Sequence, residues 1–327
     1  MSSFVVAGAT SWGLTIAHLL AQGGHDVTLL TRTSSEATII EKDRGQERLP
    51  GFELSSVVDV CAVDHAPAVV DGIVIAVPAQ AFRATAQHPL LSRNVPVLTA
   101  AKGIESSSLM RMSEVLADCG WPAERISVLS GPNLAREIVE GLAAASTVAS
   151  SDESEGEMWQ QALSTDRFRV YRSSDLIGVE LGGALKNIVA IAAGVAAGLG
   201  LGANALAALT TRGLAEITRL AVAEGASAST LLGLAGVGDL MVSCYSPLSR
   251  NHRFGERLAA GDTPVQARAV AGGVVEGADT VPAVLELAAR HGLTLPIAEQ
   301  VNAVILGDCS VTDAVEALLS RNLRSED

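Results

Sequence analysis

Short apolar runs alternate with helical patterns through the first half of the chain. Most of these runs are four to six residues long, are rich in Val, Ile and Leu, and are followed by Gly, Pro or Ser. Apolar runs that alternate with amphipathic segments are typical of the buried strands of a parallel sheet covered by helices. The predicted strands are residues 4–7, 25–30, 72–77, 95–99, 126–129 and 168–172.

The pattern changes near Ser174. From Asp175 onward it is helical, rich in Ala and interrupted by glycine turns, and no comparable strand pattern returns. The predicted fold class is therefore α/β: an N-terminal, doubly wound parallel sheet over residues 1–174, followed by an all-helical domain over residues 175–327. A chain of 327 residues is long enough for two such cores.

A long, largely apolar run without a formal charge, residues 188–209, begins two residues after Lys186. Its 22 residues would suffice to cross a membrane, but nine Ala, four Gly and one Asn leave only eight Val, Ile or Leu. We therefore expect no membrane insertion but a buried helix of the second domain with Lys186 at a functional N-terminal end. The spacing of Gly194, Gly198 and Gly202 fits a membrane dimer face and close helix packing equally well.

A glycine turn follows the first predicted strand. Gly8 and Gly13 frame it, a helical pattern begins there, and Thr10 occupies the middle position where dinucleotide-binding turns have glycine. Backbone N–H groups and the helix dipole of such a turn receive a pyrophosphate. The next predicted strand leads to Arg32, where an NAD-specific protein would place an acidic residue. Arg32 is either a solvated loop residue or a partner for a 2′-phosphate, and the second alternative favours NADPH over NADH.

Positive charge is scarce, and lysine is the scarcest source of it. The net charge is −13, and only Lys42, Lys102 and Lys186 among 23 basic residues are lysines. Nucleic acid and anionic membrane surfaces are therefore excluded as expected partners, and an anionic substrate would need cations concentrated locally. A guanidinium stays protonated, whereas a partly buried ammonium can release a proton. This difference makes Lys102 and Lys186 the candidates for a titratable amine in a functional site. Lys42 is not a candidate, because it lies in an ordinary charged run.

Four polar turns complete the candidate chemistry. The turn at Gly131 and Asn133 precedes a helical pattern and suits an anion or a carbonyl. Asp239 is either an N-cap or a fixed site carboxylate. Residues 249–251 form either a helix cap with a basic surface turn or a phosphate grip. The turn before Glu276 could reach the cofactor.

The four cysteines indicate no metal centre. Cys61, Cys119, Cys244 and Cys309 form no C-x-x-C motif and have no metal-ligand spacing with the six His residues. We interpret them as reduced thiols of a cytoplasmic protein, because the N-terminal residues also lack the pattern of a secretory signal.

Motifs along nearly the whole chain resemble one enzyme family. They are GATSWG, AVPAQAF, AAKGIE, SGPNLAREI, IGVELGGALKNIVAIAAGV, TRGLAEITRL, GLAGVGDLMVSC, SPLSRNHRFG and VVEGADT. Their order and spacing are similar to those of bacterial NAD(P)-dependent glycerol-3-phosphate dehydrogenases. The resemblance implies a Rossmann domain joined to a helical domain, reversible reduction of dihydroxyacetone phosphate to sn-glycerol 3-phosphate with NADPH or NADH, and a cytoplasmic role in glycerophospholipid synthesis.

The resemblance also implies residue roles. Lys186 matches the proton-transferring lysine, Lys102 the lysine near substrate and nicotinamide, and Asp239 a residue of the substrate shell. As a mechanistic hypothesis, we expect Asp239 also to orient the Lys186 ammonium. The implied substrate positions are Lys102, Gly131, Asn133, Lys186, Asp239, Ser249, Arg250 and Asn251. The implied cofactor positions are Gly8, Ser11, Trp12, Gly13, Arg32, Lys102, Ala135, Arg250 and Glu276.

Three residues depart from the family pattern, and two other functions remain open. Thr10 replaces a glycine, Asn133 replaces the usual Ser or Thr, and Ala203 stands where an acidic residue often precedes Asn204. The chain could instead be a related two-domain dehydrogenase for another hydroxy acid or sugar phosphate. It could also be a non-catalytic NADPH-binding sensor. Pairing into a homodimer is left open.

Overall fold

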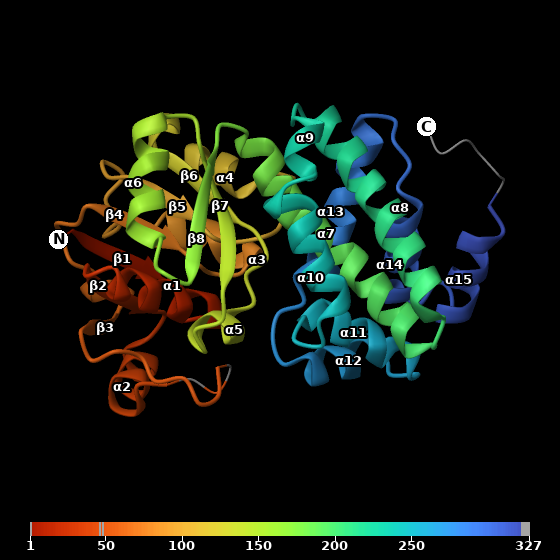
Figure 1. Cartoon of the computed structure of the whole chain (residues 1–327), viewed down its shortest axis with the longest axis horizontal. Coiled ribbons are helices and arrows are strands. Elements are labelled where there is room, and N and C mark those ends of the chain that lie inside the picture. The colour runs from red at the N-terminus through yellow and green to blue at the C-terminus, as the bar shows by residue number, and fades with distance from the viewer. Residues whose placement is uncertain (1, 46, 48, 322–327) are drawn as a thin grey trace.

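The computed structural model describes residues 2–45, 47 and 49–321. A sheet flanked by helices forms one side of the molecule, and a group of helices forms the other (Figure 1). Within the described residues, eight strands form a single sheet in the order β3-β2-β1-β4-β5-β6-β7-β8. The strands are β1 Ser3–Ala7, β2 Asp26–Thr31, β3 Val58–Ala62, β4 Gly72–Ile75, β5 Val97–Thr99, β6 Ile126–Ser130, β7 Ala144–Ser150 and β8 Phe168–Ser173.

The helices fall into two sets along the chain. Those interleaved with the strands are α1 Ser11–Gln22, α2 Ser34–Asp43, α3 Ala79–Ala86, α4 Met112–Asp118, α5 Ala135–Val139 and α6 Glu153–Leu163. Those that follow the sheet are α7 Leu176–Gly198, α8 Gly202–Ala223, α9 Ala228–Leu231, α10 Asp239–Tyr245, α11 Arg250–Ala259, α12 Pro264–Ala271, α13 Glu276–Arg290, α14 Pro296–Leu306 and α15 Val311–Leu319. Short 3₁₀ turns cover Val63–His65 and Ala123–Arg125, and a π-helical turn, η3, covers Leu234–Gly238.

The predicted α/β class with a C-terminal helical region is confirmed. All neighbouring strands are parallel except β6 and β7, which are antiparallel. The sequence pattern missed two strands, β3 and β7. β7 reads AASTVAS, and small residues with low strand propensity conceal it. β3 reads VDVCA at the end of the sheet order, where an acidic residue interrupts a short apolar pattern.

Parallel pairing brings several predicted site positions to one edge of the sheet. Gly8 follows β1, Arg32 follows β2, Lys102 follows β5 and Gly131 follows β6. The carboxyl ends of these parallel strands share an edge, which is where ligands of doubly wound sheets bind. The apolar residues form separate core clusters: one surrounds α7 in the helical region, and two others pack on the sheet.

The prediction of one buried helix across residues 188–209 with Lys186 at its N-terminal end is wrong in three respects. The run forms the end of α7 and the beginning of α8, because Gly200 and Gly202 adopt left-handed φ values of 68° and 85° between them. Only α7 is deeply buried, while the first turns of α8 face solvent. Lys186 lies in the middle of α7 rather than at its N-terminal end.

Close helix packing accounts for two of the three glycines in the small-residue spacing. A Cβ at Gly194 would lie 2.0 Å from the His252 carbonyl oxygen, and one at Gly198 would lie 2.7 Å from the Ala259 Cβ. Both contacts are with α11. Gly202 has no such neighbour within 4 Å, so its role is only to form the turn.

Two described segments are long and apolar enough to cross a membrane, Leu176–Gly198 and Ala228–Tyr245. The apolar window of the first is 89% buried inside the protein. Burial of this kind is expected of a core helix in a globular domain, where length and composition alone do not distinguish it from a membrane span.

Candidate active site

Two lysines share one buried carboxylate. Lys102 Nζ donates to Asp239 Oδ2 at 2.5 Å, and Lys186 Nζ donates to Asp239 Oδ1 at 2.7 Å. Lys102 Nζ also donates to the Gly131 carbonyl oxygen at 2.9 Å. Asp239 is 1% exposed and Lys186 is 8% exposed, so this cluster is largely removed from water. The structure therefore brings the three predicted catalytic positions and one predicted substrate position together.

Three separate elements deliver these charged groups. Lys102 follows β5, Lys186 lies on α7, and Asp239 is the first residue of α10, directly after η3. Two glycines on α7 make the approach feasible. A Cβ at Gly182 would lie 2.5 Å from the Ala235 carbonyl oxygen of η3, and one at Gly183 would lie 2.3 Å from Ser130 Oγ. The GGALKN motif thus provides both the space and the lysine.

The lysine cluster changes the acid–base properties of Lys102. Burial lowers the pKa of Lys102 from 10.5 to about 8; the Asp239 carboxylate opposes this effect, and the Lys186 ammonium adds to it. An amine with a pKa near 8 titrates close to neutrality, which suits a group that holds or transfers a proton. The sequence argument expected a tunable amine at this place.

Ser243 is a site residue that sequence reasoning missed. Its hydroxyl accepts a hydrogen bond from Lys186 Nζ at 2.5 Å and lies 3.5 Å from Asp239 Oδ1. Both residues are on α10, and Ser243 is buried. A spacing of four residues places them on the same helix face. This spacing of four residues from Asp239 is the only feature of the sequence from which Ser243 could have been predicted as a site residue.

Asn187, which follows Lys186 on α7, belongs to a chain of hydrogen-bonded amides. Asn251 Nδ2 donates to Asn187 Oδ1 at 3.0 Å, and Asn251 Oδ1 accepts from the Gly277 backbone N–H at 3.0 Å. Asn187, adjacent to Lys186, was not assigned a role from the sequence. Because its oxygen is taken and one amide hydrogen is used, Asn251 can offer a ligand its second amide hydrogen.

The predicted phosphate-gripping turn forms the start of α11. Ser249 is its N-cap, and its hydroxyl accepts from the His252 backbone N–H at 3.3 Å. The sequence left open whether this turn is a cap or a ligand site, and the capping role is present. Arg250 is exposed at the first helical position, and a Cβ at Gly273 would lie 3.2 Å from its Nη1. The Arg250 charge also acts on Glu276, where it lowers the pKa against the dominant effect of burial.

The β6 turn carries the predicted substrate positions Gly131 and Asn133. Gly131 has a φ of 153° and lies against Ser146, so a side chain at this position would collide with the β7 backbone. Asn133 Nδ2 donates to Ser146 Oγ at 3.1 Å, while the Asn133 amide oxygen is buried without a described partner. Asn133 therefore keeps a polar atom that a ligand could satisfy.

The glycine turn between β1 and α1 is closely packed. A Cβ at Gly8 would lie 2.7 Å from Val77 Cγ1, and one at Gly13 would lie 1.8 Å from the Gly8 carbonyl oxygen. Thr10 is the N-cap of α1: its hydroxyl accepts from the Gly13 N–H at 3.0 Å and donates to the Ala76 carbonyl oxygen at 2.8 Å. The hydroxyl that replaces the middle glycine is thus engaged with the protein on both sides.

The remaining cofactor positions are spread along the edge of the sheet. Ser11 and Trp12 begin α1, and the Trp12 ring N–H is buried without a described partner. Arg32 is exposed after β2, and Ala135 begins α5. No described contact joins Arg32 to the lysine cluster.

Glu276 belongs to the helical region but reaches this edge. Its Oε1 accepts from the Ala79 N–H at the start of α3 at 3.4 Å. Its Oε2 is buried without a described partner, and a Cβ at Gly103 would lie 3.4 Å from it. Burial raises the pKa of Glu276 to about 7. The buried Glu276 Oε2 and the buried Trp12 N–H are polar atoms that a bound cofactor could satisfy. Together with the glycine turn, these residues fit a dinucleotide cofactor. No described group of His, Cys, Asp and Glu could hold a metal ion.

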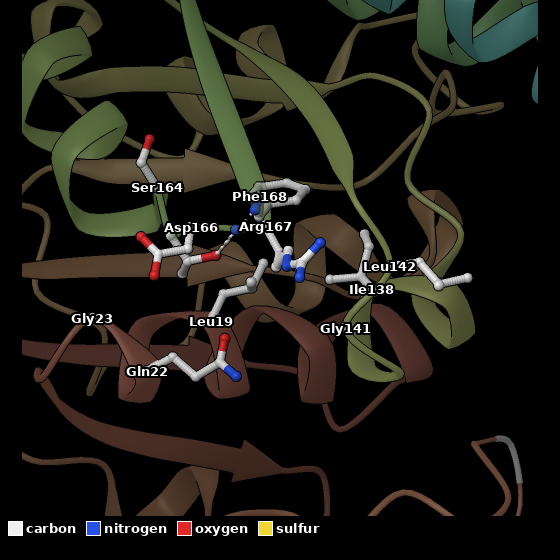
Figure 2. Close-up of a pocket in the computed structure, with 11 residues that line it drawn as sticks. Leu19, Gln22, Gly23, Ile138, Gly141, Leu142, Ser164, Asp166, Arg167 and Phe168 are labelled. Atoms are coloured by element: carbon white, nitrogen blue, oxygen red, sulfur yellow. Dashed lines mark hydrogen bonds between the residues drawn. The ribbon is translucent and has the colours of Figure 1, made fainter.

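A pocket of about 500 Å³ lies elsewhere on the sheet region (Figure 2). Leu19 and Gln22 from the end of α1, Ile138 from α5 and Phe168 from β8 line it. None of the predicted site residues contributes to it, and its place at the C-terminal end of α1 is opposite the glycine turn. The chemistry described above therefore does not coincide with this pocket.

Comparisons with known proteins give consistent matches. Models of the N-terminus and the C-terminus of NAD-dependent glycerol-3-phosphate dehydrogenase match residues 3–156 and 175–316. Glycerol-3-phosphate dehydrogenase (NAD(P)+) of Nocardia farcinica is 45% identical over 100% of both chains. The protein of the same description from Streptomyces coelicolor is 44% identical over 98% of this chain and 97% of its own. The solved structure of glycerol-3-phosphate dehydrogenase from Coxiella burnetii is 35% identical, with a TM-score of 0.93 over 98% of this chain and 99% of the other.

Proposed function

We propose that this chain, which belongs to the NAD-dependent glycerol-3-phosphate dehydrogenase family, reduces dihydroxyacetone phosphate to sn-glycerol 3-phosphate. The observation that carries the proposal is the buried Asp239 carboxylate with one lysine ammonium on each oxygen. This arrangement sets two cations at the ligand-binding edge of the sheet in a chain whose net charge is −13. Cations in that place suit an anionic substrate and a carbonyl that acquires negative charge.

Lys186 is the proposed proton donor to the C2 oxygen of the substrate. Asp239 and Ser243 fix its ammonium, with contacts of 2.7 and 2.5 Å, so that the remaining N–H can be directed at the substrate. Lys102 is the second cation near the developing alkoxide. A nicotinamide bound at the edge of the sheet would supply the hydride.

The phosphate end of the substrate is assigned to the start of α11. The Arg250 guanidinium provides the charge, and Asn251 provides its second amide hydrogen next to the N-terminus of the helix. Ser249 is proposed to contact the substrate in addition to capping α11. Gly131 and Asn133 complete the proposed substrate positions.

The proposed cofactor positions follow the carboxyl edge of the strands. Gly8, Ser11, Trp12 and Gly13 come from the first turn, Arg32 from the end of β2, Lys102 from β5, Ala135 from the start of α5, and Arg250 and Glu276 from the helical region. Exposed Arg32 could pair with a 2′-phosphate, so NADPH is the proposed preference within the NAD(P) family.

The decisive experiment follows the absorbance of the reduced nicotinamide with dihydroxyacetone phosphate and either NADPH or NADH. We expect substrate-dependent oxidation of both cofactors, with the higher kcat/KM for NADPH. Arg250→Ala should raise the KM for dihydroxyacetone phosphate strongly and leave the cofactor dissociation constant less affected. Absence of oxidation with either cofactor would contradict the proposal, and turnover of an unphosphorylated hydroxy acid in preference would redirect it.

The proposal extends to domains, location and assembly. We infer a dinucleotide-binding domain over residues 1–174 and a helical substrate domain over residues 175–327; the change from β8 to α7 at Ser173 and Leu176 supports this division. A cytoplasmic location is proposed because the four cysteines are free thiols. Supply of glycerol phosphate for glycerophospholipid synthesis is proposed from the expected product of the reaction. Light scattering would decide between a monomer and a homodimer, which the sequence leaves open.

A further inference from the structure

The residues after Lys102 form a compact loop. The Glu105 N–H donates to the Met110 carbonyl oxygen at 2.9 Å, and Ile104 pairs with Arg111 as an isolated antiparallel bridge. Ile104 is fully buried in the core cluster that includes the α7 residues. Lys102 therefore lies two residues from a point at which both ends of the loop are tied together.

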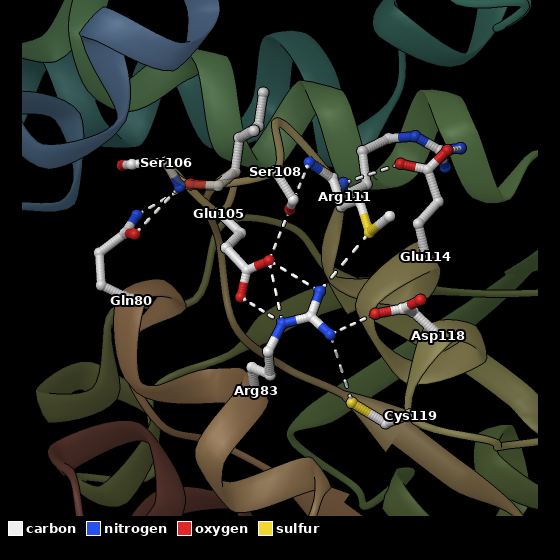
Figure 3. Close-up of polar contacts among 11 residues, drawn as sticks. Gln80, Arg83, Glu105, Ser106, Ser108, Arg111, Glu114, Asp118 and Cys119 are labelled. Atoms are coloured by element: carbon white, nitrogen blue, oxygen red, sulfur yellow. Dashed lines mark hydrogen bonds and ion pairs between the residues drawn. The ribbon is translucent and has the colours of Figure 1, made fainter.

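One side of this loop is fastened to α3. The Arg83 guanidinium contacts both Glu105 carboxylate oxygens, at 2.8 to 3.1 Å, and Figure 3 shows it lying between Glu105 and Asp118. The Gln80 amide donates to the Ile104 carbonyl oxygen at 2.9 Å and accepts from the Ser106 N–H at 3.1 Å. These contacts fix the loop relative to the sheet.

The other side is fastened to α7 by one buried carboxylate. Glu180 is 3% exposed; its Oε1 accepts from the Ser113 N–H at 2.8 Å and its Oε2 from Ser113 Oγ at 2.6 Å. Arg111 Nη1 also donates to Oε2 at 3.2 Å. Burial raises the pKa of Glu180, while Arg111 and the Ser113 hydrogen bonds oppose this and the nearby Glu114 charge adds to it. A buried carboxylate costs free energy unless such partners satisfy it, so its position is narrowly defined.

These contacts link α7 and the segment from Lys102 to Ser113 at two points, once through Asp239 and once through Glu180. We call this closed set of contacts the lysine ring. Glu180 precedes Lys186 by six residues on α7, Lys186 and Lys102 meet on Asp239, and the loop returns from Lys102 to Arg111 and Ser113. We infer that Glu180 is a positioning residue that sets the separation of Lys102 and Lys186 by locking α7 onto the start of α4. The inference rests on the proposed function of the two lysines, because Glu180 itself is not placed to touch substrate or cofactor.

Without the Glu180 carboxylate, the segment that carries Lys102 would be held less firmly relative to α7 and Lys186. The segment from β5 to α4 would keep its α3 contacts and the Ile104 packing, but its polar attachment to α7 at Glu180 would weaken. A displacement of about 1 Å in a reacting group can cost about 100-fold in rate. Loosening would also admit water to Lys102. Because burial is the main cause of the low pKa of Lys102, the pKa should move from about 8 toward 10.5.

The test compares wild type, Glu180→Gln and the milder Ser113→Ala. We expect kcat for dihydroxyacetone phosphate reduction to fall at least about 10-fold in Glu180→Gln and less in Ser113→Ala, with the NADPH dissociation constant unchanged. Acetic anhydride labelling across pH, read by mass spectrometry, reports the pKa of Lys102 without requiring turnover. The chain has only three lysines, so their peptides are easily resolved.

Glu216→Gln is the matched control. Glu216 is also a buried carboxylate on a helix of the same region, and it accepts the Ile297 and Ala298 N–H groups at the start of α14. Its loss should affect stability but leave the Lys102 labelling profile and kcat unchanged. Folded Glu180→Gln with the wild-type profile would overturn the inference, and Ser113→Ala decides if Glu180→Gln does not fold. An inactive wild type would contradict the proposed function alone, because the labelling still tests the position of Lys102.

Discussion

At the residue scale, lysine usage pointed to the centre of the site. Lys102 and Lys186 were selected because arginine cannot easily release a proton, and the structure joins both to Asp239. The hydrogen bonds of Ser243 and Asn187 could not be predicted in the same way. Serine and asparagine are common in caps and turns, and their partners depend on how α7, α10 and α11 pack. Asp239 had two interpretations that only the tertiary contacts separate.

Lys186→Arg tests the transferable proton. The guanidinium keeps the charge next to Asp239 but remains protonated, so kcat should fall by about 100-fold or more. The KM for dihydroxyacetone phosphate should change much less. Steady-state kinetics measure both parameters, and circular dichroism checks that the larger side chain has not disturbed α7. Turnover close to wild type would remove Lys186 from the role of proton donor.

The lowered pKa of Lys102 predicts that kcat/KM declines at alkaline pH. Below about pH 8 its ammonium is charged and can hold the substrate oxygen, and above that pH the charge is lost. The kcat/KM for dihydroxyacetone phosphate should therefore decline above about pH 8, by about tenfold for each further pH unit. Lys102→Arg should have lower activity but no decline in this range, because a guanidinium does not deprotonate. The same decline in both proteins would assign it to another group.

At the element scale, the sequence predicted the order of strands and helices better than their ends. The helical pattern continues through Gly200 and Gly202, and the break appears only in their left-handed φ values. Burial on one side of that break and exposure on the other are tertiary properties that an uncharged run does not reveal. The tie between α7 and α4 at Glu180 was equally invisible, because its partners are 67 and 69 residues away in the chain.

Thr10 tests the modified start of α1. Since its hydroxyl bonds to Gly13 and Ala76, Thr10→Val should lower the free energy of unfolding by about 1 kcal/mol. Thr10→Ser keeps both hydrogen bonds and should be close to wild type. Thr10→Gly restores the usual motif but should not tighten NADPH binding, because the hydroxyl is turned into the protein. Denaturation curves and cofactor titration provide the measurements, and markedly tighter binding by Thr10→Gly would mean that Thr10 obstructs the cofactor.

Gly194 tests the contact between α7 and α11. A methyl group there would lie 2.0 Å from a backbone oxygen of His252, so Gly194→Ala must separate the helices and should cost about 1–3 kcal/mol of stability. Gly156→Ala in α6 is the matched control, because its nearest neighbour is 3.5 Å away, an ordinary contact. That substitution should stabilise by up to about 1 kcal/mol through helix propensity. Equal effects of the two changes in chemical denaturation would contradict the close packing.

At the scale of the whole molecule, buried carboxylates make stability depend on pH. Glu216 on α8 is 6% exposed and accepts N–H groups from the start of α14, and burial raises its pKa from 4.5 to about 7. Between these two values the folded chain holds a proton that the unfolded chain has lost. The contribution of Glu216 to stability is therefore fully present below about pH 4.5 and is lost as the pH rises through about 7.

Glu216→Gln should remove this part of the pH dependence. Relative to wild type, the variant should gain up to about 3 kcal/mol of stability as the pH rises from 4.5 to 7. Chemical denaturation of both proteins at the two pH values measures the difference between their free energies of unfolding. The other carboxylates are present in both proteins, so their contributions cancel in this difference. Glu316→Gln, on the exposed face of α15, should leave the slope of wild type unchanged. A parallel pair of stability curves for wild type and Glu216→Gln would show that Glu216 does not hold a proton in the folded protein, and that α14 is anchored to α8 by a charged carboxylate.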